Sequence, residues 1–192
     1  TIAENRDLGL MLYDMDYSDL NIAKKALEGN AEDITPCLRC YECFGETSKS
    51  ETVKCTVNPT MGQQYPEKTR KQTADTKKRV LIAGGGPAGM EAAITAALRG
   101  HDVTLVEKSG ELGGNLHPAG AAYFKEDIRK LCKVLISRVE KAGVKVVLNT
   151  EVTPEYVETF DPDALFVAIG SNELRPPING MDLPHVIMAF DA

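Results

Sequence analysis

The sequence has no apolar run that approaches the roughly 20 residues needed to cross a bilayer. Its first six residues, Thr-Ile-Ala-Glu-Asn-Arg, have no signal-peptide character. Positive charge is also in short supply, because 22 lysines and arginines stand against 28 aspartates and glutamates, for a net charge of −6. These features argue against membrane insertion and against general affinity for nucleic acid or anionic membranes. We therefore expect a cytoplasmic protein.

Histidine is scarce as well. His101, His117 and His185 share no metal-binding spacing, and the sequence contains no internal repeats. With 192 residues, of which 43% are apolar, the chain has enough material for one sizeable core and for one or two domains. It begins with Thr1 rather than Met and has no obvious ending at Ala192, so we expect a fragment of a longer protein.

The chain is organised around residues 79–89, which supply a strand, a glycine turn and the start of a helix. The apolar run at 80–83 is typical of a central parallel strand that is covered on both faces. Gly84, Gly86 and Gly89 follow at the spacing G-x-G-x-x-G, which allows a tight turn, close approach of a pyrophosphate and close helix packing. We expect the helix over residues 90–99, and the start of that helix favours an anion.

A second expected strand, at residues 102–108, carries an acid near its end. Glu107 lies 18 residues after Gly89, close to the roughly 20 at which a carboxylate binds ribose hydroxyls. The same acid argues against a 2′-phosphate. Strand, turn, helix, strand and acid occur in order, which predicts a dinucleotide site. A doubly wound domain with an empty or vestigial site is the alternative.

Four of the five cysteines are crowded into residues 37–55. Cys37, Cys40 and Cys43 are separated by two residues each, and Cys55 follows after eleven more. In an intracellular chain such crowding indicates a metal site more than disulfides. Zinc sites more often pair two C-x2-C units, so we predict an iron-sulphur cluster, with zinc and then disulfides or unligated thiols as the alternatives.

The rest of the chain completes an α/β pattern. We expect a short helix from Ser18, its N-cap, to residue 28, with Leu20, Ala23 and Leu27 on one side. The later expected elements are an amphipathic helix at 125–142, a strand at 144–148, a helical turn at 154–157 and a strand at 163–170. Cys132 lies on the apolar stripe of its helix and is predicted to be a small buried hydrophobic residue.

These elements predict the fold class α/β, with a doubly wound parallel sheet preceded by a helical, loop-rich cysteine segment. Gly113 and Gly114 form a loop that we expect at the carboxyl edge of this sheet, beside the glycine turn. Basic residues without an apolar face predict a solvated linker at 67–78. The expected organisation is therefore a cysteine segment at 1–66, the linker, and an incomplete dinucleotide-binding domain at 79–192.

Three stretches together resemble a known family. They are Cys37-Leu-Arg-Cys-Tyr-Glu-Cys43, Cys55-Thr-Val-Asn-Pro59 and Val80-Leu-Ile-Ala-Gly-Gly-Gly-Pro-Ala-Gly-Met-Glu91. They are similar to the flavin and iron-sulphur reductases related to 2,4-dienoyl-CoA reductase, enoate reductase and trimethylamine dehydrogenase. The resemblance covers residues 19–192 and implies that 19–60 are the exit and cluster loop of an old yellow enzyme-like barrel. It also implies a Rossmann-like domain from Lys78 that binds FAD or, as in trimethylamine dehydrogenase, ADP.

The resemblance implies roles for individual residues. Cys37, Cys40, Cys43 and Cys55 would hold a 4Fe-4S cluster, and Glu107 would lie at the adenosine ribose. Its neighbour Lys108 is also expected at the cofactor. The other residues expected at the cofactor are Gly84, Gly86, Pro87, Ala88 and Gly89 in the turn, Gly113, Gly114 and Asn115 along the flavin, Val152 at the adenine, and Ala168 and Gly170 at the sheet edge. Ile169 departs from the family's Ala-Thr-Gly, and the two-residue gap between the second and third cysteines departs from the three of dienoyl-CoA reductases. No residue is predicted to act as a general acid or nucleophile.

In this family NAD(P)H reduces FAD, electrons pass through the cluster to FMN, and reduced FMN delivers hydride to an activated double bond. The resemblance implies that this chain is the electron-transfer portion of a reductase of enoates or enoyl-CoA thioesters. Its partners would be the FMN barrel and the NAD(P)H domain of the same protein, with homo-oligomer formation left open. The alternatives are a non-catalytic ADP-binding module with a zinc or cluster site, and another FAD oxidoreductase such as a glutamate synthase small subunit, against which Asn58-Pro59 speaks.

Overall fold

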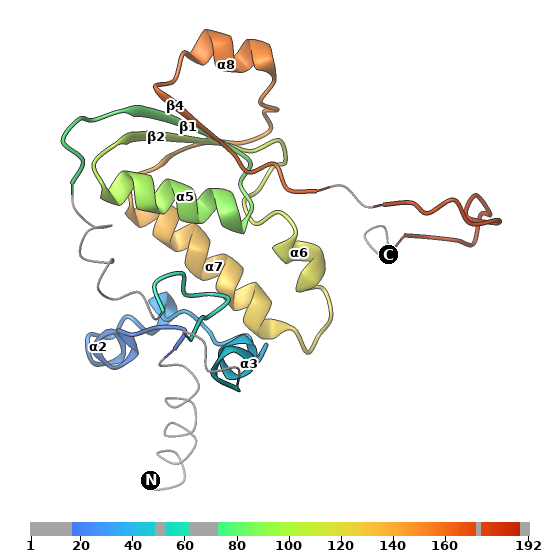
Figure 1. The fold of residues 1–192 in the computed structure, drawn as a ribbon, viewed down its shortest axis with the longest axis horizontal. Coiled ribbons are helices and arrows are strands. Elements are labelled where there is room, and N and C mark those ends of the chain that lie inside the picture. Colours follow the sequence, from blue (N-terminus) through green and yellow to red (C-terminus); the bar gives the residue numbers. More distant parts are fainter. Residues whose placement is uncertain (1–16, 49–52, 62–72, 172–173, 189–192) are drawn as a thin grey trace, which may run out of the picture.

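The chain folds around a parallel sheet of four strands. The computed structural model describes residues 17–48, 53–61, 73–171 and 174–188. The strands are β1 (Arg79–Ala83), β2 (Asp102–Val106), β3 (Lys145–Val147) and β4 (Ala164–Val167), and they lie in the order β3-β2-β1-β4. The first strand of the glycine motif is thus central, with a neighbour on each side, and the predicted fold class is confirmed (Figure 1).

Two long helices cover one face of the sheet (Figure 1). α5 (Pro87–Leu98) connects β1 to β2, and α7 (Glu126–Lys141) packs on α5. The core between these layers contains Val80, Ile82, Met90, Ala93, Val103, Leu105, Leu131, Leu135 and Val139. The short helix α6 (Leu116–Ala119) precedes α7, and α8 (Pro154–Phe160) lies on the other side of the sheet.

β1 and β4 are both apolar, but only β1 is covered. Four of the five residues of β1 are buried, whereas Phe166 and Val167 in β4 are 48% and 67% exposed. Among the strands that the structure describes, β4 has a neighbour only on the β1 side. It is therefore an edge strand with an apolar surface.

Residues 17–48 and 53–61 form a further layer against α7 (Figure 1). They contain α2 (Ile22–Leu27), the 3-10 helix η1 (Ala31–Asp33) and α3 (Glu42–Ser48). The expected helix at 18–28 was too long, and Ser18 is not its N-cap, because its hydroxyl donates to the carbonyl oxygen of Thr35 at 3.0 Å. The predicted apolar side was also wrong, since Leu20 and Leu27 are 45% and 90% exposed while Ile22 is buried.

Three smaller boundaries also differ from the expected ones. α5 begins at Pro87 rather than at residue 90, so the last three residues of the glycine motif form its first turn. α8 continues to Phe160, and α3 occupies part of the expected cysteine loop.

Of the expected linker, residues 67–72 lie outside the described part of the chain. The described remainder is tied to the sheet domain, because the N–H of Ala74 donates to the carbonyl of Arg99 at 2.9 Å and that of Asp102 to Lys78 at 2.8 Å. Within the described ranges, no helix combines the length and apolar character required to cross a bilayer.

Candidate functional site

The glycine turn at 84–89 joins β1 to α5, and its three motif glycines face different surroundings. Gly84 has a φ of +104°, and a Cβ there would lie 2.3 Å from the carbonyl oxygen of Ala168. A Cβ on Gly89 would lie 1.8 Å from the carbonyl oxygen of Gly84. A Cβ on Gly86 would meet nothing within 4 Å. The first and third glycines serve the packing of the protein itself, whereas the second leaves space in which a ligand can approach the backbone.

The open side of the turn is also the start of a helix. Gly86 is the N-cap residue of α5, and no side chain caps the first amides of this helix. These amides, together with the helix dipole, favour an anion. The double-glycine loop lies against the same turn, because the N–H of Gly113 donates to the carbonyl oxygen of Gly85 at 2.9 Å and a Cβ on Gly114 would lie 3.1 Å from the Cα of Gly86.

Glu107, the acid expected at a ribose, also braces the glycine turn. Its Oε2 accepts the N–H of Gly85 at 2.6 Å, and its Oε1 accepts the N–H and the hydroxyl of Ser109 at 2.8 and 2.9 Å. The residue is only 7% exposed. Burial acts to raise the pKa of the carboxyl, but the hydrogen bonds from Ser109 and Gly85 outweigh it and hold the pKa below its usual value. Glu107 is therefore ionised at neutral pH.

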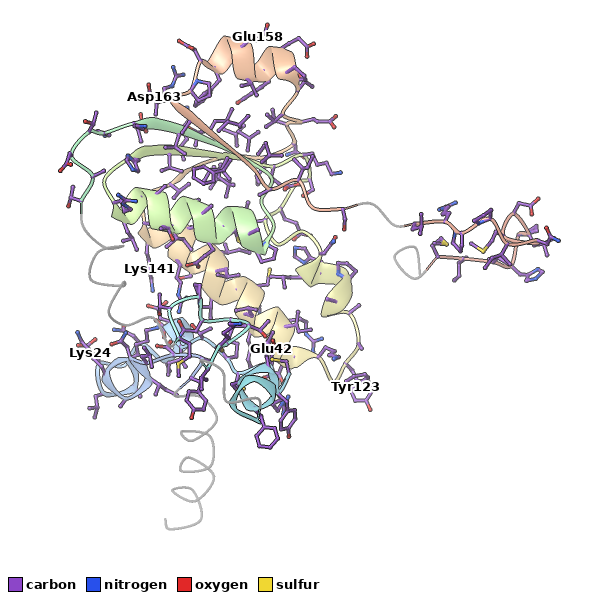
Figure 2. All side chains as sticks on the ribbon, viewed as in Figure 1. Lys24, Glu42, Tyr123, Lys141, Glu158 and Asp163 are labelled. Carbon is purple, nitrogen blue, oxygen red and sulfur yellow. The ribbon has the colours of Figure 1, made fainter. Side chains whose placement is uncertain are left out.

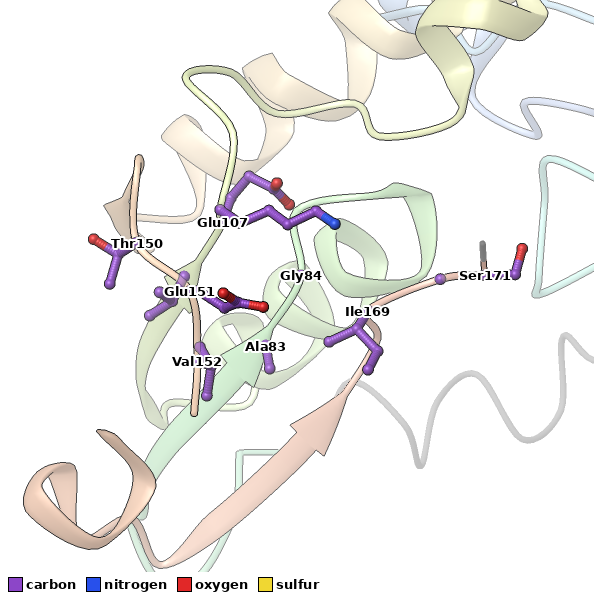
Figure 3. A pocket seen from close by; sticks show the side chains of 11 residues that line it. Ala83, Gly84, Glu107, Thr150, Glu151, Val152, Ile169 and Ser171 are labelled. Atoms are coloured by element: carbon purple, nitrogen blue, oxygen red, sulfur yellow. The ribbon is translucent and has the colours of Figure 1, made fainter. Parts of the chain in front are cut away.

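A cavity of about 260 Å³ opens at the carboxyl ends of the strands, where doubly wound sheets bind ligands (Figure 3). It is lined by Ala83, Gly84, Val106, Glu107, Lys108, Thr150, Glu151, Val152, Ile169, Gly170 and Ser171. Five of the residues expected at the cofactor are among these: Gly84, Glu107, Lys108, Val152 and Gly170. Ala168 is adjacent and pairs with Ala83 through its N–H at 2.8 Å. Outside the lining lie Gly86, Pro87, Ala88 and Gly89 in the turn and Gly113, Gly114 and Asn115 in the double-glycine loop.

Thr150 and Glu151 line this cavity but were not predicted as site residues. They follow β3 and directly precede Val152, so they reach the same edge of the sheet as Glu107. The chain is fixed at this point because the N–H of Thr150 donates to the carbonyl oxygen of Glu107 at 3.0 Å. Polar residues that follow a neighbouring parallel strand are the signal that could have identified them.

The four crowded cysteines converge on one small cavity. Cys37, Cys40, Cys43 and Cys55 line an opening of about 20 Å³. None of these cysteines is in a disulfide. Cys43 lies in α3, whereas Cys55 forms an isolated antiparallel bridge with Asn58 across a short turn. Burial raises the pKa of the Cys55 thiol against opposing backbone hydrogen bonds, and Cys37 and Cys40 act in the same direction as burial. The chain thus brings together thiols that are up to 18 residues apart in sequence.

The backbone on both sides of Cys40 adopts a rare conformation. Arg39 and Tyr41 have φ values of 53° and 59°, in the left-handed region that favours glycine. The N–H of Arg39 donates to the Sγ of Cys37 at 3.4 Å, and the Sγ of Cys40 lies 3.1 Å from the Oγ1 of Thr56. Strain of this kind clusters at functional sites, and hydrogen bonds to sulphur are among the features that tune iron-sulphur centres.

The spacing of these thiols does not suit a single metal ion, whereas their common cavity indicates a shared site. In the ranges that the structure describes, no group of three or more His, Cys, Asp or Glu side chains is spaced to hold one metal ion. All four thiols nevertheless line a single cavity. The shared cavity is compatible with a cluster, because the thiolates of a cluster bind separate iron atoms and stand farther apart than the ligands of one ion. The donor set itself, four soft thiols, suits both a cluster and zinc.

Helix α7 connects the cysteine segment to the sheet domain. Near its start Asp127 pairs with Arg39, and at its end the Nζ of Lys141 lies 2.5 Å from the Oδ2 of Asp33. Successive residues of an α-helix are rotated by about 100°, so positions 127 and 141 lie on nearly the same side of α7. The segment from Asp33 to Arg39 is thus held at both ends along one helix.

Asp19 is the buried centre of this connection. Its Oδ2 accepts the Nζ of Lys25 at 2.5 Å and the N–H of Thr35 at 2.9 Å, and the guanidinium of Arg138 lies 3.8 Å away. Arg138 in turn donates to the Oγ1 of Thr35 at 2.5 Å. Burial acts to raise the pKa of Asp19, but the hydrogen bonds from Lys25 and Thr35 leave it below its usual value.

Cys132 faces the double-glycine loop from α7. It is 6% exposed, which confirms the prediction of a buried residue. A Cβ on Gly113 would lie 2.7 Å from its Sγ and 2.4 Å from the Nε2 of His117. The Nε2 of His117 lies 2.9 Å from the carbonyl oxygen of Leu112. Both side chains lie against the loop, and with a φ of +130° at position 113 a residue larger than glycine would be strained there.

Comparison with known proteins agrees with this geometry. Residues 79–170, which contain the glycine turn, Glu107 and most of the cavity lining, match the family model described as FAD dependent oxidoreductase. They form an FAD dependent oxidoreductase domain. The FAD domain defined in this way includes all four strands of the sheet.

Reductases and an oxidase are among the relatives of the FAD domain and its cysteine segment. The chain is 42% identical to the cinnamate reductase of Clostridium sporogenes, in a match that covers 86% of this chain and 25% of the relative. It is 40% identical to the NADH oxidase of Thermoanaerobacter brockii, over 88% of this chain and 26% of the relative. A 2-naphthoyl-CoA reductase in complex with 2-naphthoyl-CoA has a TM-score of 0.86 at 36% identity, over 93% of this chain and 27% of that protein.

These comparisons confirm the family resemblance that the sequence motifs indicated. Over most of its length the chain is thus similar to reductases of this family. It spans about a quarter of the length of the relatives that it matches.

Proposed function

We propose that this chain is the electron-transfer portion of a flavin and iron-sulphur NAD(P)H oxidoreductase that reduces activated C=C bonds of enoates or enoyl-CoA thioesters. The observation that carries this proposal is a four-thiol cavity attached through one helix to an FAD domain. The names of two relatives, cinnamate reductase and 2-naphthoyl-CoA reductase, support the substrate class.

In this proposal the FAD domain binds and orients the nucleotide through its backbone. The first amides of α5 would face the pyrophosphate at Gly86, where the open space admits a ligand. Glu107 would accept a ribose hydroxyl, Val152 would meet the adenine, and Gly113 would let the chain pass close to the flavin. The bound flavin would supply the change from hydride transfer to single-electron transfer.

The cysteine segment would hold the second redox group. Cys37, Cys40, Cys43 and Cys55 would ligate a 4Fe-4S cluster, a one-electron carrier. The N–H of Arg39 would continue to donate to sulphur and so stabilise the thiolate form. FMN, NAD(P)H and their domains would belong to other parts of the longer protein, because this chain matches only about a quarter of each relative.

The test is a chemical analysis of the chain purified under anaerobic conditions. Iron, acid-labile sulphide and zinc would be quantified together with the adenine nucleotide released on denaturation. We expect about four iron and four sulphide per chain and one bound FAD. Ultraviolet-visible spectra should show flavin bands and a broad shoulder that is lost on reduction by dithionite.

Two other results would overturn the proposed function. Zinc without iron or sulphide, together with ADP, would make the chain a nucleotide-binding structural module. A protein without metal and without nucleotide, which also fails to take up iron, sulphide or FAD during reconstitution, would exclude both functions.

A further inference from the structure

The cavity of the FAD domain is lined by two carboxylates, and the two are engaged very differently. Glu107 directly follows β2 and Glu151 follows β3, so both reach the carboxyl edge of the sheet (Figure 3). Lys108 is the basic residue among the lining residues. The lining therefore carries two formal negative charges and one positive charge.

Glu107 has little capacity left for a ligand. A carboxylate offers about four lone-pair positions, and Gly85 and Ser109 already supply three donors at 2.6 to 2.9 Å. Loss of the bond from Gly85 would remove a hydrogen bond that fixes the backbone of the glycine turn, because Gly85 directly follows Gly84, the first glycine of the motif. Glu107 can accept about one further hydrogen bond and is fixed in its present orientation.

Glu151 is open to a ligand. Its side chain is exposed, and within the described ranges it accepts no hydrogen bond and forms no ion pair. In Figure 3 its carboxylate points into the cavity toward Gly84, the first residue of the glycine turn. The backbone directly before it is held by the bond from Thr150 to Glu107 at 3.0 Å. Glu151 thus presents unused acceptors from a fixed position.

We propose that Glu151 gives this cavity its preference for an adenine nucleotide whose ribose carries no 2′-phosphate. A free carboxylate accepts hydrogen bonds from the hydroxyl and amino groups of adenosine and repels a phosphate. Glu107 adds negative charge, but it is buried and already hydrogen-bonded, and one lysine does not neutralise both acids. Glu151 is therefore a specificity residue of the nucleotide site, an inference that rests on the proposed function of the FAD domain.

The test compares ADP with 2′-phosphoadenosine 5′-diphosphate by isothermal titration calorimetry. Glu151→Gln keeps the size of the side chain and removes its charge. Glu158→Gln is the matched control, because Glu158 projects from α8 outside the cavity lining (Figure 2). We expect the wild-type chain to prefer ADP, Glu151→Gln to reduce this preference about tenfold, and Glu158→Gln to leave it unchanged.

Glu151→Asp keeps the charge and should retain most of the preference, which separates a charge effect from a folding defect. A ratio of the two dissociation constants in Glu151→Gln within twofold of the wild-type ratio would overturn the role of Glu151 while leaving the nucleotide site in place. Failure of the wild-type chain to bind either nucleotide would instead remove the proposed function, and this inference with it.

Discussion

The two candidate binding sites of this chain are built in opposite ways. The glycine turn is a site made of backbone, in which the absence of side chains at Gly84, Gly86 and Gly89 creates the turn, the open space and the helix contact. The cysteine site is made of side chains, in which four thiols are carried by a backbone that adopts unfavourable conformations at Arg39 and Tyr41. Substitutions that add a side chain should therefore damage the glycine turn. Substitutions that replace a thiol should damage the cysteine site.

The two sites have one feature in common. Beside each of them a buried carboxylate accepts hydrogen bonds from nearby backbone N–H groups. Glu107 binds Gly85 beside the glycine turn, and Asp19 binds Thr35 ahead of the first cysteine. Both acids are less than 10% exposed, and hydrogen bonds hold the pKa of both below the usual value despite burial. The difference between the sites thus lies in what contacts a ligand, while their support is alike.

The largest effect should come from adding one methyl group to the glycine turn. Gly89→Ala should lower the free energy of unfolding by about 3 kcal/mol or prevent folding, because its Cβ would lie 1.8 Å from a backbone oxygen. Gly86→Ala should leave the melting temperature nearly unchanged, because its φ of −73° suits alanine and its Cβ meets open space. Urea denaturation and calorimetry with FAD would measure both variants.

Gly86→Ala should nevertheless weaken FAD binding at least tenfold, since the methyl group would occupy the space expected for the pyrophosphate. Undiminished binding by Gly86→Ala would place the pyrophosphate elsewhere. The pair therefore separates the packing role of one glycine from the ligand role of the other.

Altering one thiol should remove the metal and spare the fold. Cys43→Ser should lose most of the bound iron and sulphide, since serine is a poor ligand for a cluster. Cys132→Ser is the matched control, because Cys132 is buried on α7 outside the four-thiol cavity, and its iron content should equal that of the wild type. Iron analysis after anaerobic purification distinguishes the two, and equal iron in Cys43→Ser and wild type would exclude Cys43 as a ligand.

Asp19→Asn should loosen the cysteine segment. The amide keeps the shape but loses the charge-assisted bonds from Lys25 and Thr35, so the free energy of unfolding at pH 7 should fall by about 2 kcal/mol. The folded-state pKa of Asp19 is lowered, so its stabilisation is present above the unfolded-state value of about 3.9 and is lost as the pH falls through the folded-state pKa.

The difference between wild type and Asp19→Asn should therefore narrow as the pH falls below about 4. Urea titrations between pH 7 and pH 3 would follow it. A difference that stays constant over this range would mean that the charge of Asp19 contributes nothing.

The smallest effect should come from the exposed ion pair between Lys141 of α7 and Asp33 of the cysteine segment. Lys141→Met removes the pair with Asp33 and should cost at most about 1 kcal/mol, because the lysine side chain is 55% exposed. Lys133→Met is the control on the same helix, and its stability should be unchanged. The loss in Lys141→Met should also shrink at 1 M salt, where exposed charges are screened, and a loss that is insensitive to salt would point to packing instead.

Local patterns were sufficient to predict the sheet domain. The apolar run at 80–83, the glycine spacing and the stripe that includes Leu131 and Leu135 are signals contained within a few turns or one strand, and each element formed close to its expected position. The parallel direction of the strands followed from the alternation of strands and helices, whereas the position of β4 beside β1 was not predicted. The cavity at the sheet edge is lined by Glu107, which the spacing singled out, and by Val152, which the family resemblance singled out.

Contacts between distant residues could not be predicted in this way. Ser18 looked like an N-cap, but its hydroxyl binds Thr35, which is 17 residues away. Ile22 rather than Leu27 is buried, which the spacing of the apolar residues did not indicate. Glu151 was missed because a lone exposed acid carries no periodic signal, and its position after a neighbouring parallel strand was the signal that could have placed it at the cavity of Glu107.

The stretch from Asp33 to Arg39 spans six residue steps, which extend to about 20–22 Å at most. The fourteen steps from Asp127 to Lys141, which anchor it, rise about 21 Å. The helix length between the two anchors is thus close to the fully extended length of the segment. The long side chains of Arg39 and Lys141 supply the remaining reach. Inserting a full turn into α7 between Asp127 and Lys141 should break one of the two ion pairs. An insertion of equal length in an exposed loop of the same domain should leave both pairs intact.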